Sequence, residues 1–450
     1  MGGQQWPPHH RRAGSRDCLS CGGAVRPSRH PDYRRARREP LSPARFVAHA
    51  LRDFLQDLFR LNRDLRLLAS ALLIWGIGEG IFFYYQPLYL AQWGASPEAI
   101  GGILGLGGLM LTLSHLPAGW LADGLGRRQL MWASWGAGLL AAWLMALAPS
   151  LTVFALGVVF YYASGFVMAP MNSYITAARG PLSVGRALTL LSATFNLGAI
   201  LGPVFGSLLV SWLHMRGLYL ISAVLFLIST LTVLFLRPQP VHPQSNSLAA
   251  LRRARPPRAF VLLIGLTMLT VFAAYLPQPL APNFLVEHRQ VALPVVGRLG
   301  ALSRLGLVVL NVLVGGLDPR WGYLLAQGAL ASFALLVWQG QGMVWYALAF
   351  FLMGGQGTIR SLSAALARPL VSEAHMGLAY GLMETANGLP LFLAPLLAGW
   401  LYGRYPEALW SLSFGALLAL MLGTALWLFR TPAFVPSLHT EPAPGVSPDR

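Results

Sequence analysis

Ionisable side chains interrupt four of the long apolar stretches in this chain of 450 residues. Glu79 lies in the run GIGEGIF, and Arg304, Arg360 and Glu384 lie in three later runs. A charged group inside hydrocarbon is costly, so residues of this kind usually serve a function in membrane proteins. Glu79 and Glu384 are therefore candidate proton carriers, although a carboxylate that only bonds a neighbouring helix is the alternative. Arg304 could neutralise an acidic solute or pair with a glutamate across a cavity.

Polar and aromatic residues on the same apolar runs could complete a solute site. The candidate residues for such a cavity are Tyr84, Tyr85, Gln86, Asn172, Asn196, Gln278, Arg304, Asn311 and Arg360. Their amide, hydroxyl and guanidinium groups can bond a solute, and bonds between helices would explain each amide about equally well. The patch from Tyr84 to Gln86 is both polar and aromatic, which suits an amphipathic solute.

The composition predicts that lipid surrounds most of the chain. Hydrophobic residues make up 55% of it and charged residues only 11%, against roughly 25% charged in an average soluble domain. A membrane span needs about 20 apolar residues, and twelve candidates satisfy this. They lie at about 65–90, 100–119, 129–148, 151–177, 186–211, 217–236, 259–281, 294–316, 322–338, 343–367, 377–402 and 408–429. We therefore expect an all-α integral membrane protein.

A polar, arginine-rich break divides the predicted spans into two sets of six. Residues 65–236 form the first half, 237–258 a linker, and 259–430 the second half. The halves echo each other at nearly constant spacing, as in Gln86-Pro87 and Gln278-Pro279, which is typical of duplicated transporters. Residues 1–41 are expected to be a disordered basic tail that could lie outside the native protein. Residues 42–64 are expected to form an amphipathic interfacial helix, and 431–450 a C-terminal tail.

The arginines predict the orientation. All 33 basic residues are arginine, and 14 of them precede residue 67. Most others fall in the linker or in loops on the same side, as the positive-inside rule requires. We expect a multi-pass protein of the inner (plasma) membrane with both termini in the cytoplasm. The formal charge of +17 therefore does not indicate nucleic-acid binding.

A loop motif follows the second predicted span. The run GWLADGLGRR contains Gly119, Asp123, Gly126, Arg127 and Arg128. It resembles the loop motif of the major facilitator superfamily (MFS), and the resemblance implies two pseudo-symmetric halves, alternating access and usually a monomer. In that family the aspartate latches the halves by contacting the start of the eleventh helix, here near residue 377. A turn that only fixes topology is the alternative reading, and Gly124 stands where the family usually has an arginine.

The fifth predicted span carries a second motif of small residues. Gly198, Gly202, Pro203 and Gly206 follow the order GxxxGPxxG. This run resembles the antiporter motif of proton-linked exporters, and close helix packing is the alternative explanation. Such exporters usually carry an arginine in the fourth helix. No arginine occurs between residues 151 and 177 of this chain. Arg360, in the equivalent span of the other half, could supply a comparable charge.

These features predict a secondary active transporter rather than an enzyme. The preferred function is proton-coupled efflux of a small amphipathic or drug-like solute. A sugar or organic-acid symporter or facilitator is the first alternative, and a non-transporting membrane sensor or assembly factor is the second. We expect protons as a partner and no cofactor. We also expect no metal, because structural zinc needs four ligands; His9, His10 and His30 could join Cys18 and Cys21 only if the N-terminal tail folded.

Overall fold

Residues 52, 56–57, 60–239, 257–371 and 376–431 are described by a computed structural model, without the side chains of 116–125, 376–378 and 380. Most of the predicted interfacial helix, the centre of the linker and both tails lie outside this description. All regular elements in the described part are helical, which confirms the all-α prediction.

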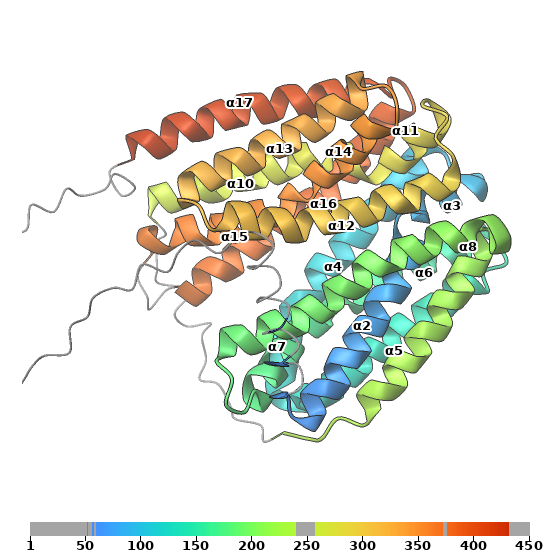
Figure 1. Cartoon of the computed structure of the whole chain (residues 1–450), viewed down its shortest axis with the longest axis vertical. Helices are drawn as coiled ribbons and strands as arrows, with labels where there is room; N and C mark the ends of the chain where they lie inside the picture. Colours follow the sequence, from blue (N-terminus) through green and yellow to red (C-terminus); the bar gives the residue numbers. More distant parts are fainter. Residues whose placement is uncertain (1–51, 53–55, 58–59, 240–256, 372–375, 432–450) are drawn as a thin grey trace, which may run out of the picture. The chain divides into compact units, whose positions relative to one another are not determined.

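Figure 1 shows the helices of the part that follows residue 53. Those of the first half are α2 (Arg63–Phe83), α3 (Gln86–Gln92), α4 (Pro97–Leu125), α5 (Arg127–Ala146), α6 (Leu151–Ala163), η1 (Ser164–Val167), α7 (Met168–Ala178) and α8 (Val184–Leu234). Those of the second half are α10 (Arg258–Tyr275), η2 (Gln278–Leu280), α11 (Ala281–Glu287), α12 (Leu293–Gly315), α13 (Pro319–Gln339), α14 (Met343–Met353), α15 (Gly355–Ala367), η3 (Arg368–Leu370), α16 (Met376–Tyr402) and α17 (Ala408–Arg430).

Eight helical segments in the described residues are long and apolar enough to cross a membrane. One of them, α8, contains two predicted spans, because the non-helical residue His214 (φ 55°) separates its two arms. Figure 1 shows α8 running to one end and returning. The structure is therefore consistent with twelve spans, and that number stays a prediction.

Polar residues fix where several helices begin. The Ser96 hydroxyl accepts a hydrogen bond from the Ala99 amide at 3.3 Å, and Pro97 follows at the first helical position of α4. The Asp318 carboxylate likewise accepts the Arg320 amide at 2.9 Å at the start of α13. These groups satisfy amides that have no partner within the helix.

Four predicted spans are interrupted, at equivalent places in the two halves. Turns after Phe83 and Tyr275 separate α2 from α3 and α10 from α11. Similar breaks separate α6 from α7 and α14 from α15. Proline explains the breaks near Pro87 and Pro279, because it cannot donate a backbone hydrogen bond. The repeated breaks reflect the duplicated architecture.

A glycine seam joins α2 to the first arm of α8. A Cβ atom added at Gly202 would lie 2.7 Å from the Gly80 Cα atom, and one added at Gly76 would lie 3.0 Å from the Ala199 nitrogen. Both positions leave no room for a side chain, so the two backbones are in direct contact.

The two halves also approach each other through glycine. A Cβ atom added at Gly399 of α16 would lie 3.1 Å from the Gly101 Cα atom of α4. At a second crossing, one added at Gly297 of α12 would lie 2.7 Å from the Pro203 carbonyl oxygen of α8. Near the first crossing, Arg404 pairs with Glu98 at 3.3 Å.

Candidate functional site

A cavity of about 260 Å³ lies between the two halves. Aromatic and polar residues dominate its lining, together with proline and glycine from the helix breaks. The lining residues are Phe83, Tyr84, Gln86, Pro87, Leu104, Tyr162, Tyr275, Gln278, Pro279, Pro282, Ser303, Arg304, Leu307, Met353, Gly354, Gln356, Gly357 and Arg360. Because Tyr84, Pro279 and Gly354 sit at or beside breaks, the interruptions of the helices help to shape the cavity.

Glu79 lies beside this cavity and bonds to both halves. Its Oε2 atom accepts a hydrogen bond from the Tyr161 hydroxyl at 2.9 Å. Its Oε1 atom lies 3.8 Å from the Arg304 Nη2 atom, and the two side chains are 19% and 21% exposed. The Arg304 guanidinium also lies 5.3 Å from the centre of the Phe83 ring. The pair joins α2 of the first half to α12 of the second.

Arg360 and Glu384 form a second, shorter ion pair. The Arg360 Nη2 atom lies 2.6 Å from the Glu384 Oε2 atom, and their side chains are 53% and 63% exposed. Arg360 lines the cavity, whereas Glu384 does not. Unlike the Glu79–Arg304 pair, this one lies within the second half, since it joins α15 to α16.

Three of the other predicted cavity residues line the cavity. Tyr84, Gln86 and Gln278 are part of its wall. The Tyr162 hydroxyl donates to the Gln86 side-chain oxygen at 3.3 Å, and the Gln278 amide donates to the Ala274 carbonyl at 3.0 Å. Gln278 therefore uses one donor to bond the end of the preceding helix, α10.

The remaining predicted cavity residues lie elsewhere. Tyr85 is fully buried and packs against Gly297. Asn196 and Asn311 donate to carbonyl oxygens of their own helices at 2.8 Å and 3.0 Å, and Asn172 is exposed on α7. None of these four is in the cavity wall. No described residue of α7 or α8 lines the cavity, and the sequence could not determine the direction of these side chains.

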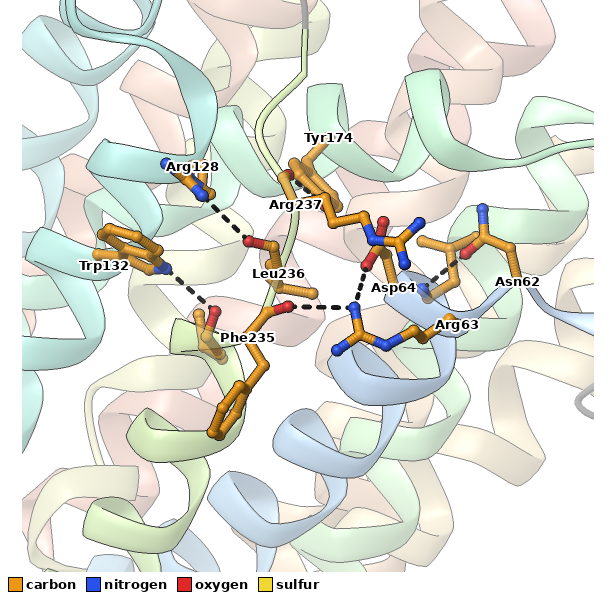
Figure 2. Close-up of polar contacts among 11 residues, drawn as sticks. Asn62, Arg63, Asp64, Arg128, Trp132, Tyr174, Phe235, Leu236 and Arg237 are labelled. Atoms are coloured by element: carbon orange, nitrogen blue, oxygen red, sulfur yellow. Dashed lines mark hydrogen bonds and ion pairs between the residues drawn. The ribbon is translucent and has the colours of Figure 1, made fainter.

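The two arginines of the loop motif hold the end of α8, as Figure 2 shows in part. The Arg128 Nη1 atom donates to the Leu236 carbonyl at 3.3 Å, and Arg127 donates to the Gln239 side chain at 3.5 Å. The Trp132 indole donates to the Val233 carbonyl at 3.0 Å. Trp132 thereby satisfies a carbonyl group that the end of α8 leaves without a helical partner, while Arg128 and Arg127 bond the segment that follows α8.

Other helices bind the same segment. Arg63 of α2 donates to the Phe235 carbonyl at 3.4 Å, and the Tyr174 hydroxyl of α7 donates to the Arg237 carbonyl at 2.9 Å (Figure 2). The side chain of Asp123 lies outside the description, so the expected latch to the start of α16 stays a prediction. Gly126 ends α4 with φ 90°, a conformation that favours glycine.

Comparison with known proteins decides the family. A model described as Major Facilitator Superfamily matches residues 67–277 and 263–447. The chain belongs to the major facilitator superfamily. It is 26% identical over 350 residues to the Escherichia coli "Tetracycline resistance protein, class C", covering 74% of this chain and 86% of that protein. It is 22% identical over 400 residues to the Escherichia coli "Inner membrane transport protein YajR", covering 82% and 85%.

Solved structures of MFS transporters share the fold. The nucleoside transporter NupG aligns with a TM-score of 0.70 at 15% identity, covering 82% of this chain and all of that one. Membership of the MFS confirms the prediction of a membrane-spanning transporter of small molecules. Transporters of this family are not enzymes.

Three tyrosines in or beside the cavity were not among the predicted site residues. Tyr161 bonds the Glu79 carboxylate and Tyr162 bonds Gln86, although neither tyrosine was predicted to be there. Their position just before the break at Ser164 and Gly165 is the signal that could have found them. Tyr275 has the same signal, because it precedes the break that begins at Leu276.

Proposed function

We propose that this MFS protein exports a small amphipathic solute in exchange for protons, and that Glu79 binds the proton. The observation that carries this proposal is the carboxylate of Glu79 beside the cavity, bonded to Tyr161 at 2.9 Å and 3.8 Å from Arg304. A carboxylate that lies well inside a membrane span and contacts both halves can link its protonation to their relative position.

The charge of Glu79 determines how strongly the halves attract each other at this point. Two unit charges about 4 Å apart attract by roughly 4 kcal/mol at an effective dielectric constant of 20. Desolvation of both groups reduces the net value. Protonation of Glu79 removes the attraction to Arg304, so the halves can separate there. Loss of the proton restores it, which gives the two steps of an alternating cycle.

The chemistry of the cavity wall supports an amphipathic solute. The wall offers ring surfaces from Phe83, Tyr84, Tyr162 and Tyr275. It offers hydrogen-bonding groups from Gln86, Gln278 and Ser303. Aromatic side chains with polar edges suit molecules that combine apolar and polar parts. The name of the Escherichia coli relative, a tetracycline resistance protein, favours export.

The test is transport by the purified chain in proteoliposomes with an imposed pH gradient. Fluorescent amphipathic compounds serve as solutes. We expect a gradient to accelerate the uphill flux of a transported compound in the wild type and to have no effect on Glu79→Gln. Glu407→Gln is the matched control, because Glu407 is exposed between α16 and α17. If Glu79→Gln responds to the gradient as the wild type does, Glu79 is not the proton carrier.

Co-transport of an organic acid with a proton is the second candidate, and the charges of the wall favour it. Among the described lining residues, the charged ones are Arg304 and Arg360. An anion bound at Arg304 competes with the Glu79 carboxylate, so it binds better after Glu79 is protonated. The same assay distinguishes the two: solute moves with protons in co-transport and against them in exchange.

We propose that both termini face the cytoplasm and that the chain works as a monomer. The distribution of arginine supports the orientation. Single cysteines placed in opposite loops and labelled from outside the cell test it. We also propose that Asp123 contacts the start of α16 when the halves close on that side. A non-transporting sensor is excluded if the purified protein moves any solute.

A further inference from the structure

A second hollow, separate from the cavity, lies between α4, α10 and α16. This groove has a volume of about 500 Å³, and its walls include Leu109 and Thr112 of α4, Val261 and Ile264 of α10, and Leu382 and Leu389 of α16. The hydroxyl of Thr112 donates to the Gly108 carbonyl at 2.8 Å, within its own helix. The hydroxyl of Thr385, also in the wall, donates to the Gly381 carbonyl at 2.9 Å. The described walls therefore suit hydrocarbon.

The direction of the side chains places this groove on the outer surface of the helix bundle. Leu382, Leu389 and Trp400 fall on one face of α16, given about 3.6 residues per turn. They are 38%, 45% and 48% exposed. None of these three side chains is in the described wall of the cavity.

Glu384 points away from the exposed leucines of α16. It lies roughly 200° around the helix from Leu382, at about 100° per residue. Its carboxylate bonds Arg360, which lines the cavity. No described residue of α16 is in the cavity wall, whereas the exposed side chains of Leu382 and Leu389 line the groove, so the groove faces the bilayer.

The length of the groove corresponds to one leaflet. Between Leu382 and Phe392, both in the wall, the helix rises about 15 Å. The hydrocarbon core of a bilayer is roughly 30 Å thick, so this length is about half of it. One acyl chain of a phospholipid would fit along the groove.

A cationic side chain begins α10, just before the residues of that helix that line the groove. Arg258 is the first residue of α10 and is exposed, about one helical turn before Val261. A guanidinium group at the start of a membrane-spanning helix can reach the headgroup region and bind a phosphate there through two parallel hydrogen bonds. Arginine near the surface also attracts anionic lipid in general.

We propose that this groove binds an anionic phospholipid, with an acyl chain between α4, α10 and α16 and its phosphate at Arg258. The site includes residues of both halves, since α4 belongs to the first and α10 and α16 to the second. A bound lipid stabilises the conformation in which the groove is formed, because it binds that conformation better than one without the groove.

Native mass spectrometry of the full chain in detergent tests this proposal. Phosphatidylglycerol and phosphatidylcholine with identical acyl chains are the probes. We expect wild type to bind phosphatidylglycerol more tightly than phosphatidylcholine. Arg258→Gln lowers the affinity for phosphatidylglycerol about fivefold, the effect expected of one cation at a membrane surface, and leaves phosphatidylcholine unchanged. Arg430→Gln is the matched control, because Arg430 is an exposed arginine at the end of α17.

A second variant tests the position of the acyl chain. Ala386 lies in the groove wall, so Ala386→Phe fills the groove and weakens binding of both lipids, whereas Ala419→Phe on the exposed face of α17 does not. Monodisperse elution confirms folding, and Ala386→Leu replaces the variant if it fails. If the wild type binds both lipids equally, the preference for an anionic headgroup is refuted. It is also refuted if Arg258→Gln and Arg430→Gln bind phosphatidylglycerol with the same affinity. Unchanged binding by Ala386→Phe refutes the location. Since no solute flux is measured, the result does not depend on the proposed function.

Discussion

The crossing of α4 and α16 can be tested by adding one methyl group at Gly101. A Cβ atom there would lie 2.9 Å from the Gly399 Cα atom and even closer to the Pro395 carbonyl oxygen. Ordinary contacts of a Cβ atom begin at 3.4 Å. Both neighbours are backbone atoms that cannot rotate away, so Gly101→Ala forces the helices apart by at least about 0.5 Å, in a core that resists overpacking.

The size of the effect follows from the cost of overpacking. Extra methyl groups in packed interfaces typically cost about 1–3 kcal/mol. Because this crossing joins the two halves, the cost falls on the conformation in which these helix ends meet. We expect Gly101→Ala to shift the equilibrium between conformations about 5–150-fold towards the one in which these ends are separated.

Spin-label distance measurements provide the assay. Gln92 and Tyr405 are exposed near the crossing, one in each half. The pair Gln92→Cys and Tyr405→Cys, in a background with Cys18→Ser and Cys21→Ser, takes two labels. Double electron–electron resonance of Gly101→Ala should show a larger population at long distance than the same labelled protein without it.

The adjacent glycine provides the control. A Cβ atom at Gly102 would meet no atom within 4 Å, so Gly102→Ala should give the distance distribution of the labelled parent. If Gly101→Ala and Gly102→Ala give the same distribution, the contact at Gly101 does not limit the approach of the halves. Size-exclusion chromatography and thermal unfolding check that both variants are folded.

Two further predictions concern stability. The Ser229 hydroxyl accepts a hydrogen bond from the Trp135 indole at 3.0 Å and donates one to the Ala71 carbonyl at 2.8 Å. Ser229→Ala should therefore lower the stability measured by thermal unfolding by about 1–3 kcal/mol. A loss of stability no larger than that of the exposed Ser70→Ala would contradict this. In the loop before α13, hydrogen bonds from Arg320 lower the pKa of Asp318 below its usual 3.8. Such a carboxylate stabilises the fold above its unfolded pKa and loses that effect as pH falls through the folded pKa. Asp318→Asn should therefore lower the melting temperature near about pH 6 but not near about pH 2, and an equal difference at both would refute the argument.

Most of the helices could be predicted because a membrane span is a local property of the sequence. Runs of about 20 apolar residues and serine caps such as Ser96 define them without knowledge of the fold. The boundaries were less accurate: the second span was expected at 100–119, whereas α4 continues to Leu125. Its last turn includes part of the loop motif, since Gly126 rather than Gly119 ends the helix.

The pairing of charges could not be predicted from spacing. Glu79 and Arg304 were each chosen for their cost inside a membrane, but nothing local indicates that they lie 3.8 Å apart. Tyr161 bonds Glu79 from another helix, 82 positions away. For the fifth-span motif, the structure adds that Gly198 and Gly202 contact the α2 backbone. That contact explains the small residues by packing and leaves a role in exchange as a proposal.

The glycine seam between α2 and α8 has a mechanical consequence. Gly80 contacts Gly202, and Gly76 contacts the backbone near Ala199. Because their backbones are in direct contact, α2 and the first arm of α8 must tilt together as one rigid unit. Glu79 belongs to this rigid unit, whereas Arg304 belongs to α12 of the other half. The distance between the Glu79 carboxylate and the Arg304 guanidinium therefore changes with the angle between the two halves. A vibrational probe on either residue would read that angle directly, whatever the solute.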